Sequence, residues 1–427
     1  MITRFVVVTV AVALISGCAT AQSSLPFAHS AAASSAHAHA IEKVLYSFTG
    51  GTDGGGPNGS LVFDGVGNVY GTTHFGGIDT CGGQVGGGCG VVFELSPTKS
   101  SGWSESALYA FADGADGGFP NAGVILDKNG NVDGTASTGG SSQCAIGCGV
   151  VYELTKVSNW KESVLHTFTG NDGEFPNAVL LAGSTGALYS TTWYGGNTGN
   201  GTVFALAPKS GGWNESVLYN FQGTNDGSAP AGGVVADKAG NLYGTTYKYD
   251  GDNDGVAFEL RNASHAPWKD RVLYTFTNNG GGEDPYAGMF MAAKGRFFGT
   301  AIEGGTTGGG VAFELSLGAG RRWTESVVHT FGNAGDGSAP YGGLIADNAG
   351  NLFGTTVFGG SANAGTVYEL SPTRRGAWKE RILYSFGGGS DGAYPGGTLA
   401  LDSAGNLYGA ASNGGQNGYG VIFEVTR

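Results

Sequence analysis

The sequence is poor in charged residues, and the deficit is largest for the basic ones. Asp, Glu, Lys and Arg together make up 13% of the 427 residues, which is about half of the average share. Lys and Arg number 21 against 34 Asp and Glu, so the net charge is −13 at pH 7, and the basic residues form no run. Nucleic acids and anionic membranes are bound by clustered Lys and Arg. The sequence therefore predicts neither a nucleic-acid partner nor a folded surface that binds membranes.

The N-terminal apolar run, residues 5–15, is shorter than the roughly 20 residues that span a bilayer. It follows Arg4 and is typical of the apolar segment of a signal peptide. The next motif, Ile-Ser-Gly-Cys, resembles the bacterial lipobox, in which the cysteine, here Cys18, is diacylated and becomes the mature N-terminus. An Ala-Thr-Ala motif at residues 19–21 leaves open an ordinary cleavage that would release a soluble protein.

These motifs divide the N-terminal region into two parts. Residues 1–17 are predicted to be a lipoprotein-type signal peptide, and residues 18–40, rich in Ala, Ser and His, a tether. We expect an exported protein, either an outer-membrane lipoprotein or one free in the periplasm or at the cell surface. The N-terminal lipid would then be its contact with the membrane.

Glycine is abundant instead: it makes up 83 of the 427 residues, whereas its average share in proteins is about 7%. Glycine costs about 1 kcal/mol relative to alanine inside a helix, so this content excludes a helical protein. The glycines do not recur at every third position, which excludes collagen. Because 40% of the residues are hydrophobic and 11% aromatic, there is material for a core. The composition predicts an all-β, turn-rich globular chain.

A segment that reads Val-Leu-Tyr-x-Phe in its commonest form recurs seven times. Its final residues are Phe48, Phe111, Phe168, Phe221, Phe276, Phe331 and Phe386. Each repeat, about 55 residues long, reads as four short strands, illustrated by residues 233–237, 242–246, 201–206 and 213–221. Four strands in such a repeat are typical of a β-propeller blade, so residues 41–427 are predicted to form a seven-bladed propeller.

The two ends of this region predict how the ring closes. Residues 41–48 read as a lone fourth strand, whereas residues 421–425 read as a third strand with no fourth strand after it. The N-terminal strand is therefore expected to complete the seventh blade. Closure of this kind removes exposed sheet edges, which promote aggregation.

Residues that recur in nearly every repeat are interpreted as structural. The aspartates of the D-G-x-x-P turns are expected to cap those turns, and the tryptophans of the W-x-E motif to pack between blades. Glycines inside the second strands are expected to mark close backbone approach near the axis. His166 and His329 replace the tyrosine of the fourth strand and are interpreted as packed strand residues. The glycines inside the second strands are Gly71, Gly134, Gly244, Gly299, Gly354 and Gly409.

The units D-G-x-x-P-x-G-G, D-x-x-G-N-L-Y-G-T-T, G-x-V-F-E-L and W-x-E-x-V-L-Y-x-F resemble the GloVer-type tandem repeat. The resemblance covers residues 41–427 and implies a β-propeller of an exported bacterial protein that carries a surface anchor. It assigns no catalytic residues. The D-x-x-G-N-L-Y segment also resembles NHL-type propeller repeats, whose period is shorter.

Four cysteines lie in the second-to-third-strand loops of the first two blades. Four cysteines in an exported protein indicate two disulfides. The favoured pairs are Cys81–Cys89 and Cys144–Cys148, each within one loop, and pairing across the blades is the alternative. A four-thiolate zinc site agrees with the number of cysteines but not with their spacing.

The corresponding loop of the fourth blade carries the acidic motif D-x-D-x-D-G. Its residues Asp250, Asp252 and Asp254 resemble the start of a calcium-binding loop, in which alternate carboxylates surround a hard cation. The twelfth position of such a loop would be Arg261, which is no calcium ligand. A solvated acidic turn is the alternative interpretation.

Aromatic residues also gather in these loops. Aromatic rings stack on the apolar faces of sugars, while nearby polar groups bind the hydroxyls. The alternative to sugar binding is that these rings pack beneath the neighbouring glycines. The candidate ligand-binding residues are Phe75, Trp193, Tyr194, Tyr247, Tyr249 and Phe358.

Enzyme motifs such as H-E-x-x-H, G-x-S-x-G and the P-loop are missing from the sequence. The first hypothesis is therefore a monomeric surface module that binds a carbohydrate or a protein, with calcium as its candidate cofactor. The alternative is a hydrolase or lyase acting on polysaccharides. Its carboxylate pair would come from Glu303 and Asp250 on adjacent blades.

Overall fold

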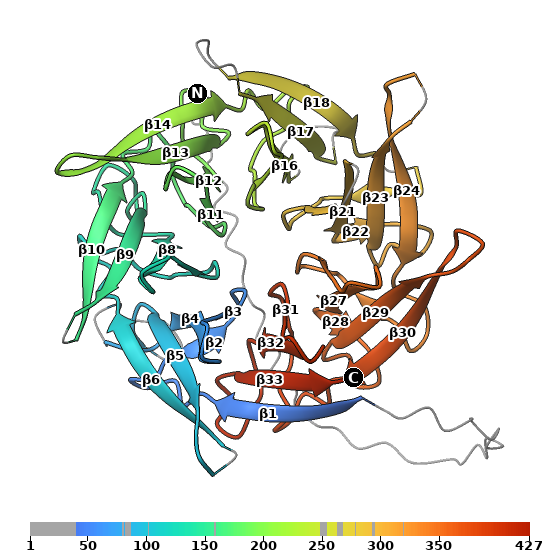
Figure 1. Ribbon diagram of the computed structural model, residues 1–427, viewed down its shortest axis with the longest axis horizontal. Coiled ribbons are helices and arrows are strands. Elements are labelled where there is room, and N and C mark those ends of the chain that lie inside the picture. Colours follow the sequence, from blue (N-terminus) through green and yellow to red (C-terminus); the bar gives the residue numbers. More distant parts are fainter. Residues whose placement is uncertain are drawn as a thin grey trace, which may run out of the picture. The chain divides into compact units, whose positions relative to one another are not determined.

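The structure is a computed structural model that describes residues 40–78, 81, 87–100, 102–157, 159–247, 254–262, 268–277, 279–292, 295–318 and 320–427. Seven four-stranded antiparallel sheets surround a central axis (Figure 1), so the predicted all-β, seven-bladed propeller is confirmed. The described residues form strands and turns but no helix. None of their segments is a helix that could span a membrane.

Each blade has four strands, ordered here from the axis outward. The first strands are β3 (Val62–Phe63), β7 (Ile125–Leu126), β11 (Leu181–Ala182), β15 (Val235–Ala236), β20 (Phe290–Ala292), β26 (Ile345–Ala346) and β31 (Ala400–Leu401). The second strands are β4 (Val69–Phe75), β8 (Val132–Ala136), β12 (Leu188–Thr192), β16 (Leu242–Thr246), β21 (Arg296–Ala301), β27 (Leu352–Thr356) and β32 (Leu407–Ala411). Blades 1 to 7 are numbered in the order of their first strands.

The third strands are β5 (Val91–Pro97), β9 (Val150–Lys156), β13 (Thr202–Lys209), β17 (Val256–Arg261), β23 (Val311–Leu317), β29 (Thr366–Pro372) and β33 (Val421–Thr426). The outer strands are β6 (Trp103–Ala110), β10 (Trp160–Thr167), β14 (Gly212–Asn220), β18 (Lys269–Thr275), β24 (Trp323–Thr330), β30 (Trp378–Ser385) and β1 (Ile41–Ser47). Three short strands lie in blade connections: β2 (Gly55–Pro57), β19 (Gly282–Glu283) and β25 (Gly337–Ser338). β2 pairs with β4, whereas β19 and β25 pair with short strands of the second-to-third-strand loops, β22 (Glu303–Gly304) and β28 (Phe358–Gly359).

The N-terminal strand closes the ring, as the sequence predicts. β1 pairs antiparallel with β33, and the register runs from Ile41 opposite Thr426 to Ser47 opposite Val421. Beyond the strand, the Phe48 N–H donates to the Gly420 carbonyl at 3.0 Å. Blade 7 is thus built from both ends of the described chain.

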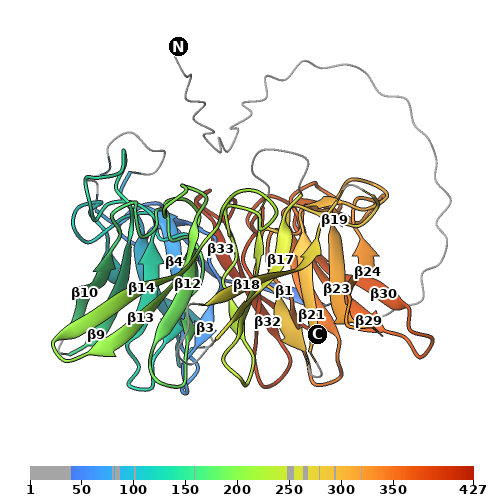
Figure 2. The same ribbon diagram turned by 90° about the horizontal axis from the view of Figure 1, so that it is seen from above.

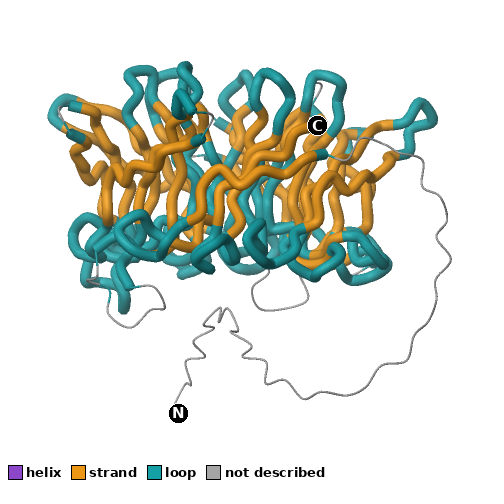
Figure 3. Tube along the Cα trace, turned by 90° about the horizontal axis from the view of Figure 1, so that it is seen from below, coloured by secondary structure: helices purple, strands orange, loops and turns teal. Residues whose placement is uncertain are grey.

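The strands lie between two layers of loops, which Figures 2 and 3 show from opposite sides. Because neighbouring strands are antiparallel, the second-to-third-strand loops lie at the same end of each blade as the connections to the next blade. We call this end the loop face. The opposite end, which carries the two hairpin turns of each blade, is the hairpin face.

The core consists of apolar layers between neighbouring blades. The last phenylalanine of each Val-Leu-Tyr-x-Phe segment is fully buried and contacts an aromatic ring in the third strand of the next blade. Phe221, for example, lies 5.2 Å from Phe258, measured between ring centroids. The same contact recurs at every junction, as Phe48–Phe93, Phe111–Tyr152, Phe168–Phe204, Phe276–Phe313, Phe331–Tyr368 and Phe386–Phe423.

The tryptophans of the W-x-E motif also pack between blades, as predicted. Trp160 of blade 2 contacts Tyr70 of blade 1 with ring centroids 6.4 Å apart, and Trp378 of blade 6 contacts Phe298 of blade 5 at 5.7 Å. Each tryptophan therefore extends the apolar layer toward the hairpin face.

The glycines of the second strands have a different role from the one expected. A Cβ atom on Gly244 would lie 2.6 Å from the ring of Phe258, its partner on the neighbouring third strand, and one on Gly71 equally close to the ring of Phe93. The close approach is thus made by an aromatic side chain within the same sheet and not by backbone at the axis.

Backbone crowding at the axis occurs instead at glycines that follow the proline of most turns between blades. A Cβ on Gly59 would lie 2.7 Å from the backbone nitrogen of Gly123 in the next blade. Threonines of the second strands tie this inner ring together, since Thr300 Oγ1 donates to the Gly342 carbonyl at 2.9 Å. Equivalent bonds join Thr72–Ala122, Thr135–Ala178, Thr191–Gly232, Thr245–Ala287 and Thr355–Gly397.

The D-G-x-x-P aspartates cap the turns between blades, as predicted. Asp226 accepts from the backbone N–H of Gln222 at 2.8 Å and from the hydroxyl of Tyr219, on outer strand β14, at 2.8 Å. The same tyrosine-to-aspartate bond recurs as Tyr46–Asp53, Tyr109–Asp116 and Tyr384–Asp391. At two other junctions a histidine takes the place of the tyrosine.

Candidate binding site on the loop face

Aromatic rings from four successive blades contact one another on the loop face. Trp193 follows β12 and stacks on Tyr194, with ring centroids 5.6 Å apart and planes 3° from parallel. The Trp193 ring also contacts Tyr247, which follows β16, at 6.4 Å, and Tyr286, which follows a blade-connecting proline, at 6.0 Å. Tyr286 in turn contacts Tyr247 at 5.9 Å and Tyr341 at 5.1 Å. We call these five residues the aromatic cluster.

Four of the five cluster residues occupy two positions of the repeat that carry smaller or more polar residues in the other blades. The position after the second strand holds Trp193 and Tyr247 in blades 3 and 4 and elsewhere His74, Ser137, Ile302, Val357 and Ser412. The position after the turn proline holds Tyr286 and Tyr341 in blades 5 and 6 and elsewhere Asn58, Asn121, Asn177, Ala231 and Gly396. The loop face is therefore aromatic over blades 3 to 6 and amide-rich over blades 1 to 3.

The amide-rich side carries polar atoms that the described residues leave unsatisfied. His74 Nδ1 and Asn177 Oδ1 are buried and have no hydrogen-bond partner in the part of the chain that the structure describes. Burial lowers the pKa of His74, against the smaller opposite effect of a hydrogen bond with Asn121. The His74 imidazole is therefore neutral at physiological pH, and its ring lies 5.2 Å from that of Phe119.

The phenols of the cluster are neutral as well. Burial, together with the neighbouring Tyr341 and Tyr247, raises the pKa of Tyr286 to about 12. Burial and the carboxylate of Asp284 raise the pKa of Tyr247 to about 12. The Tyr341 pKa is raised by burial and by Glu303 and Asp284. The site thus combines aromatic faces, phenolic hydroxyls and two carboxylates.

The chain matches the model of a known repeat family. The family model described as the Gloeobacter/Verrucomicrobia repeat matches residues 82–281, 127–323 and 268–427. The chain belongs to this repeat family. The resemblance drawn from the repeated motifs is therefore confirmed.

Solved structures give more distant matches to this member of the repeat family. A candidate oxidoreductase (glucose dehydrogenase) from Thermus thermophilus is 14% identical, with a TM-score of 0.40, covering 71% of this chain and 95% of the other. A candidate 6-phosphogluconolactonase from Bacteroides uniformis is 12% identical, with a TM-score of 0.45, covering 75% of this chain and 83% of the other. Among curated proteins, no sequence matches the chain.

The structure brings together three of the aromatic residues singled out in the sequence: Trp193, Tyr194 and Tyr247. Phe75 packs elsewhere, over Gly55 and near Tyr419, whose ring centroid is 6.1 Å away. Phe358 is 42% exposed and contacts Tyr394 at 5.6 Å. Tyr249 lies outside the described residues.

Tyr286 and Tyr341 were not among the residues expected to bind a ligand. Their signal was present in the aligned repeats, because both follow the turn proline, where the first three blades carry asparagine. The aromatic residues named from the sequence all belong to the second-to-third-strand loops. Tyr286 and Tyr341 belong to the blade connections, which share the loop face.

Both favoured disulfides are present in this repeat-family member. Cys81 and Cys89 are joined with Cα atoms 5.5 Å apart, and Cys144 and Cys148 with Cα atoms 5.1 Å apart. Each bond lies within one loop, so all four thiols are used without pairing across blades or a zinc site.

The remaining predicted sites lie mostly outside the described residues. These are Cys18, Asp250 and Asp252. Asp254 is described and buried, and its carbonyl accepts from the Asp284 N–H at 3.0 Å. The calcium site therefore stays a prediction.

A cavity of about 350 Å³ lies on the hairpin face between turns of blades 6 and 7. The charged side chains that line it already have partners: Arg427 pairs with Asp347 at 3.1 Å, and Asp402 accepts from Asn406 at 2.9 Å. Since these groups bind one another, we assign this cavity no ligand.

Proposed function

We propose that this chain is an exported, lipid-anchored propeller that binds a neutral carbohydrate at the aromatic cluster. The observation that carries the proposal is the continuous contact of half-buried aromatic rings across blades 3 to 6. Planar rings of this kind suit the apolar faces of sugars. The phenols and the carboxylates of Asp284 and Glu303 would bind sugar hydroxyls.

Charge supports a neutral ligand over an anionic one. The net charge is −13, and the charged groups that shift the cluster's tyrosine pKa values are the carboxylates Asp284 and Glu303. An anionic ligand would be repelled by these groups. A neutral polysaccharide meets no such penalty.

A glycan array tests the site, with Trp193→Ser as the decisive variant. Serine occupies the equivalent position in blades 2 and 7, so the substitution follows the chain's own repeat. We expect the wild type to bind neutral glycans and the variant to lose that signal. Phe358→Ser is the matched control, because Phe358 is an exposed loop aromatic outside the cluster. Absence of neutral glycan binding by the wild type, or equal binding by wild type and Trp193→Ser, contradicts the proposal.

The anchor is tested separately by mass spectrometry of the mature N-terminus. We expect a diacylated Cys18 at the first position. An unmodified N-terminus at Gln22 would show that the protein is released without a lipid.

A polysaccharide-cleaving enzyme is the second candidate, because two carboxylates lie close enough to the cluster to raise tyrosine pKa values. Asp284 is buried and Glu303 is exposed on β22, an asymmetry that would suit a pair with separate acid and base roles. Release of reducing ends from a bound polysaccharide, lost in Asp284→Asn and Glu303→Gln, would support an enzyme. Binding without release supports the module.

A further inference from the structure

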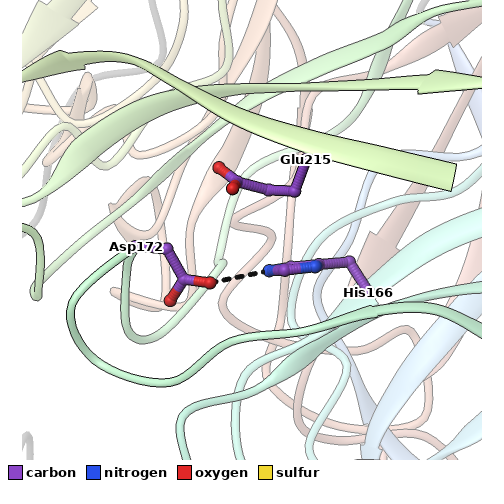
Figure 4. Close-up of side chains that lie close together, drawn as sticks. All are labelled: His166, Asp172 and Glu215. Carbon is purple, nitrogen blue, oxygen red and sulfur yellow. Dashed lines mark hydrogen bonds and ion pairs between the residues drawn. The ribbon is translucent and has the colours of Figure 1, made fainter.

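Two of the seven blade junctions carry a histidine where five carry a tyrosine. At the first, His166 of β10 contacts Asp172 in the connection to blade 3, with Nε2 and Oδ2 2.9 Å apart. Glu215 of β14 points toward both from the neighbouring blade (Figure 4). One ligand atom from each of these three side chains lies within 4.8 Å of the other two.

The same cluster recurs three junctions further along the ring. His329 of β24 lies 3.1 Å from Asp336 and 3.5 Å from Glu380 of β30. Its three ligand atoms again lie within 4.8 Å of one another. Two sites with the same residues in the same order therefore connect blades 2 and 3 and blades 5 and 6.

Contacts around the first cluster hold its side chains in place. Asp172 Oδ1 accepts from the Thr169 N–H at 2.8 Å and from the Thr169 hydroxyl at 3.0 Å, so that Oδ2 faces His166. The His166 ring packs edge-on against Phe168, with centroids 4.7 Å apart. Hydrogen bonds to the outer oxygen of a carboxylate ligand are typical of metal sites.

The glutamate from the neighbouring blade carries a buried carboxylate oxygen that makes no hydrogen bond with any described residue. Glu215 Oε1 is buried and makes no hydrogen bond within the described residues, and the same holds for Glu42, Glu105 and Glu162 at tyrosine junctions. Glu380 Oε1 in the second cluster makes no hydrogen bond with these residues either, but it lies 3.5 Å from His329 Nε2. A buried carboxylate oxygen without a hydrogen bond is costly unless a cation or a proton neutralises it. The neighbouring blade therefore offers an acceptor oxygen at both kinds of junction, and the histidine junctions add an imidazole beside it.

The tyrosine junctions provide an internal comparison. At the junction of blades 1 and 2, Tyr109 donates to Asp116 at 3.1 Å, and Glu162 approaches from the next blade. A tyrosine satisfies the hydrogen bond as well as a histidine does. The histidine adds an imidazole nitrogen, which is a ligand that divalent transition metals favour.

We propose that each histidine cluster binds one divalent transition-metal ion, with Zn²⁺ as the reference ion. The ligands are His166, Asp172 and Glu215 in one site and His329, Asp336 and Glu380 in the other. The ligand atoms around a zinc ion lie about 3.4 Å apart. Small movements of the side chains would bring the three ligand atoms of each cluster to this distance. The ion would take the place of the proton between the histidine Nε2 and the aspartate, with the neutral imidazole carrying its proton on Nδ1, and three protein ligands leave a position for water.

Calorimetric titration of the metal-stripped full chain with ZnCl₂ at pH 7.5 tests the proposal. His166→Tyr and His329→Tyr are suitable variants, because tyrosine occupies this position at the other five junctions. We expect each single variant to lose one Zn²⁺ per chain and the double variant to lose two. The tether also contains His29, His37 and His39, so the decisive quantity is the difference from the wild type.

The reverse substitution should create a site. Tyr109→His places an imidazole beside Asp116 and Glu162, and we expect one additional Zn²⁺ per chain. The pair Glu215→Gln and Glu380→Gln offers a second route that keeps both histidines and should also remove two ions. An equal Zn²⁺ stoichiometry in the wild type and in the folded double variants would overturn the proposal.

Discussion

At the scale of single residues, the main feature is a pair of carboxyl groups shared by neighbouring blades. Glu105 faces Asp53, and Glu162 faces Asp116, each glutamate coming from the W-x-E motif of the following blade. Burial, and then the charge of the aspartate, raises the pKa of each glutamate to about 7. These glutamates are therefore partly protonated near neutral pH.

The stability of the propeller should consequently fall as the pH rises from 5.5 to 8.5. A carboxyl group whose pKa is higher in the folded chain contributes stability that is complete below its unfolded pKa, near 4.5, and lost as the pH rises through about 7. Thermal unfolding measured across this range should show a lower Tm at the alkaline end. Glu162→Gln should weaken this pH dependence, because the amide does not ionise.

The control is Glu314→Gln, since Glu314 pairs with Arg296 at 2.6 Å outside these carboxyl pairs. It should leave the pH dependence unchanged. A Tm that rises toward pH 8.5 in the wild type, or equal slopes for the wild type and Glu162→Gln, would refute the role assigned to the junction glutamates.

The junction between blades 4 and 5 departs from this pattern of paired carboxyl groups. Gly281 replaces the turn aspartate before blade 5, and Glu325 takes over its contacts. The Glu325 carboxylate accepts from the Tyr274 hydroxyl at 3.0 Å and from the Gly282 N–H at 2.9 Å. A single carboxylate can therefore satisfy the tyrosine and the turn. The sequence alone did not reveal this exchange, because the partners are 43 and 51 positions apart.

At the scale of strands and blades, the repeated aromatic contact is the main source of cohesion. Each terminal phenylalanine is fully buried and touches the third strand of the next blade, so it stabilises two sheets at once. Such aromatic pairs add about 0.5–1.5 kcal/mol beyond the burial of their area.

Phe221→Ala should therefore lower the free energy of unfolding by about 3–5 kcal/mol, which is typical of a large side chain removed from a core. Urea denaturation monitored by circular dichroism measures this change. Phe358→Ala, at a ring that is 42% exposed, should change stability by less than about 0.5 kcal/mol. Similar losses for both variants would contradict the assigned core.

The acidic loop of blade 4 predicts a single calcium ion. Titration calorimetry of the chelator-treated protein should detect one equivalent of Ca²⁺, which binds through Asp250, Asp252 and Asp254. Asp250→Asn with Asp252→Asn should abolish the signal, since both changes remove a charge. If wild type and variant give the same heats as buffer, the loop is a solvated acidic turn.

At the scale of the whole molecule, the repeat made the fold predictable. Seven copies of one motif defined the number of blades, and the unmatched strand at residues 41–48 defined the closure. The aromatic cluster was only partly predictable. Trp193, Tyr194 and Tyr247 were named as loop aromatics, whereas Tyr286 and Tyr341 become significant only once blade connections and loops meet on one face.

The second-strand glycines illustrate a different limit of sequence reasoning. A glycine in a strand indicates that something approaches closely, but not what approaches. Gly244 makes room for the ring of Phe258 on the neighbouring strand. This pairing can be recognised only once the strand register is known.

Ring closure predicts that β1 protects the edge of blade 7. Deleting residues 40–48 would expose the hydrogen-bonding edge of β33 and should lower the Tm and cause aggregation, detected by light scattering. Shortening the tether within residues 22–36 is the control and should leave both properties unchanged. A monomeric deletion variant with an unaltered Tm would show that the strand is dispensable.

The central claim is that the loop face binds a neutral sugar through the aromatic cluster. Its most direct test is an equilibrium titration of one bound neutral oligosaccharide against the wild type, Trp193→Ser and Tyr286→Asn, in which both variants follow residues of the equivalent repeat positions. Loss of a stacking ring worth about 1.4 kcal/mol corresponds to a tenfold change in Kd. We predict at least this weakening for each variant, with Phe358→Ser unchanged. Equal affinities in all four proteins would contradict the account.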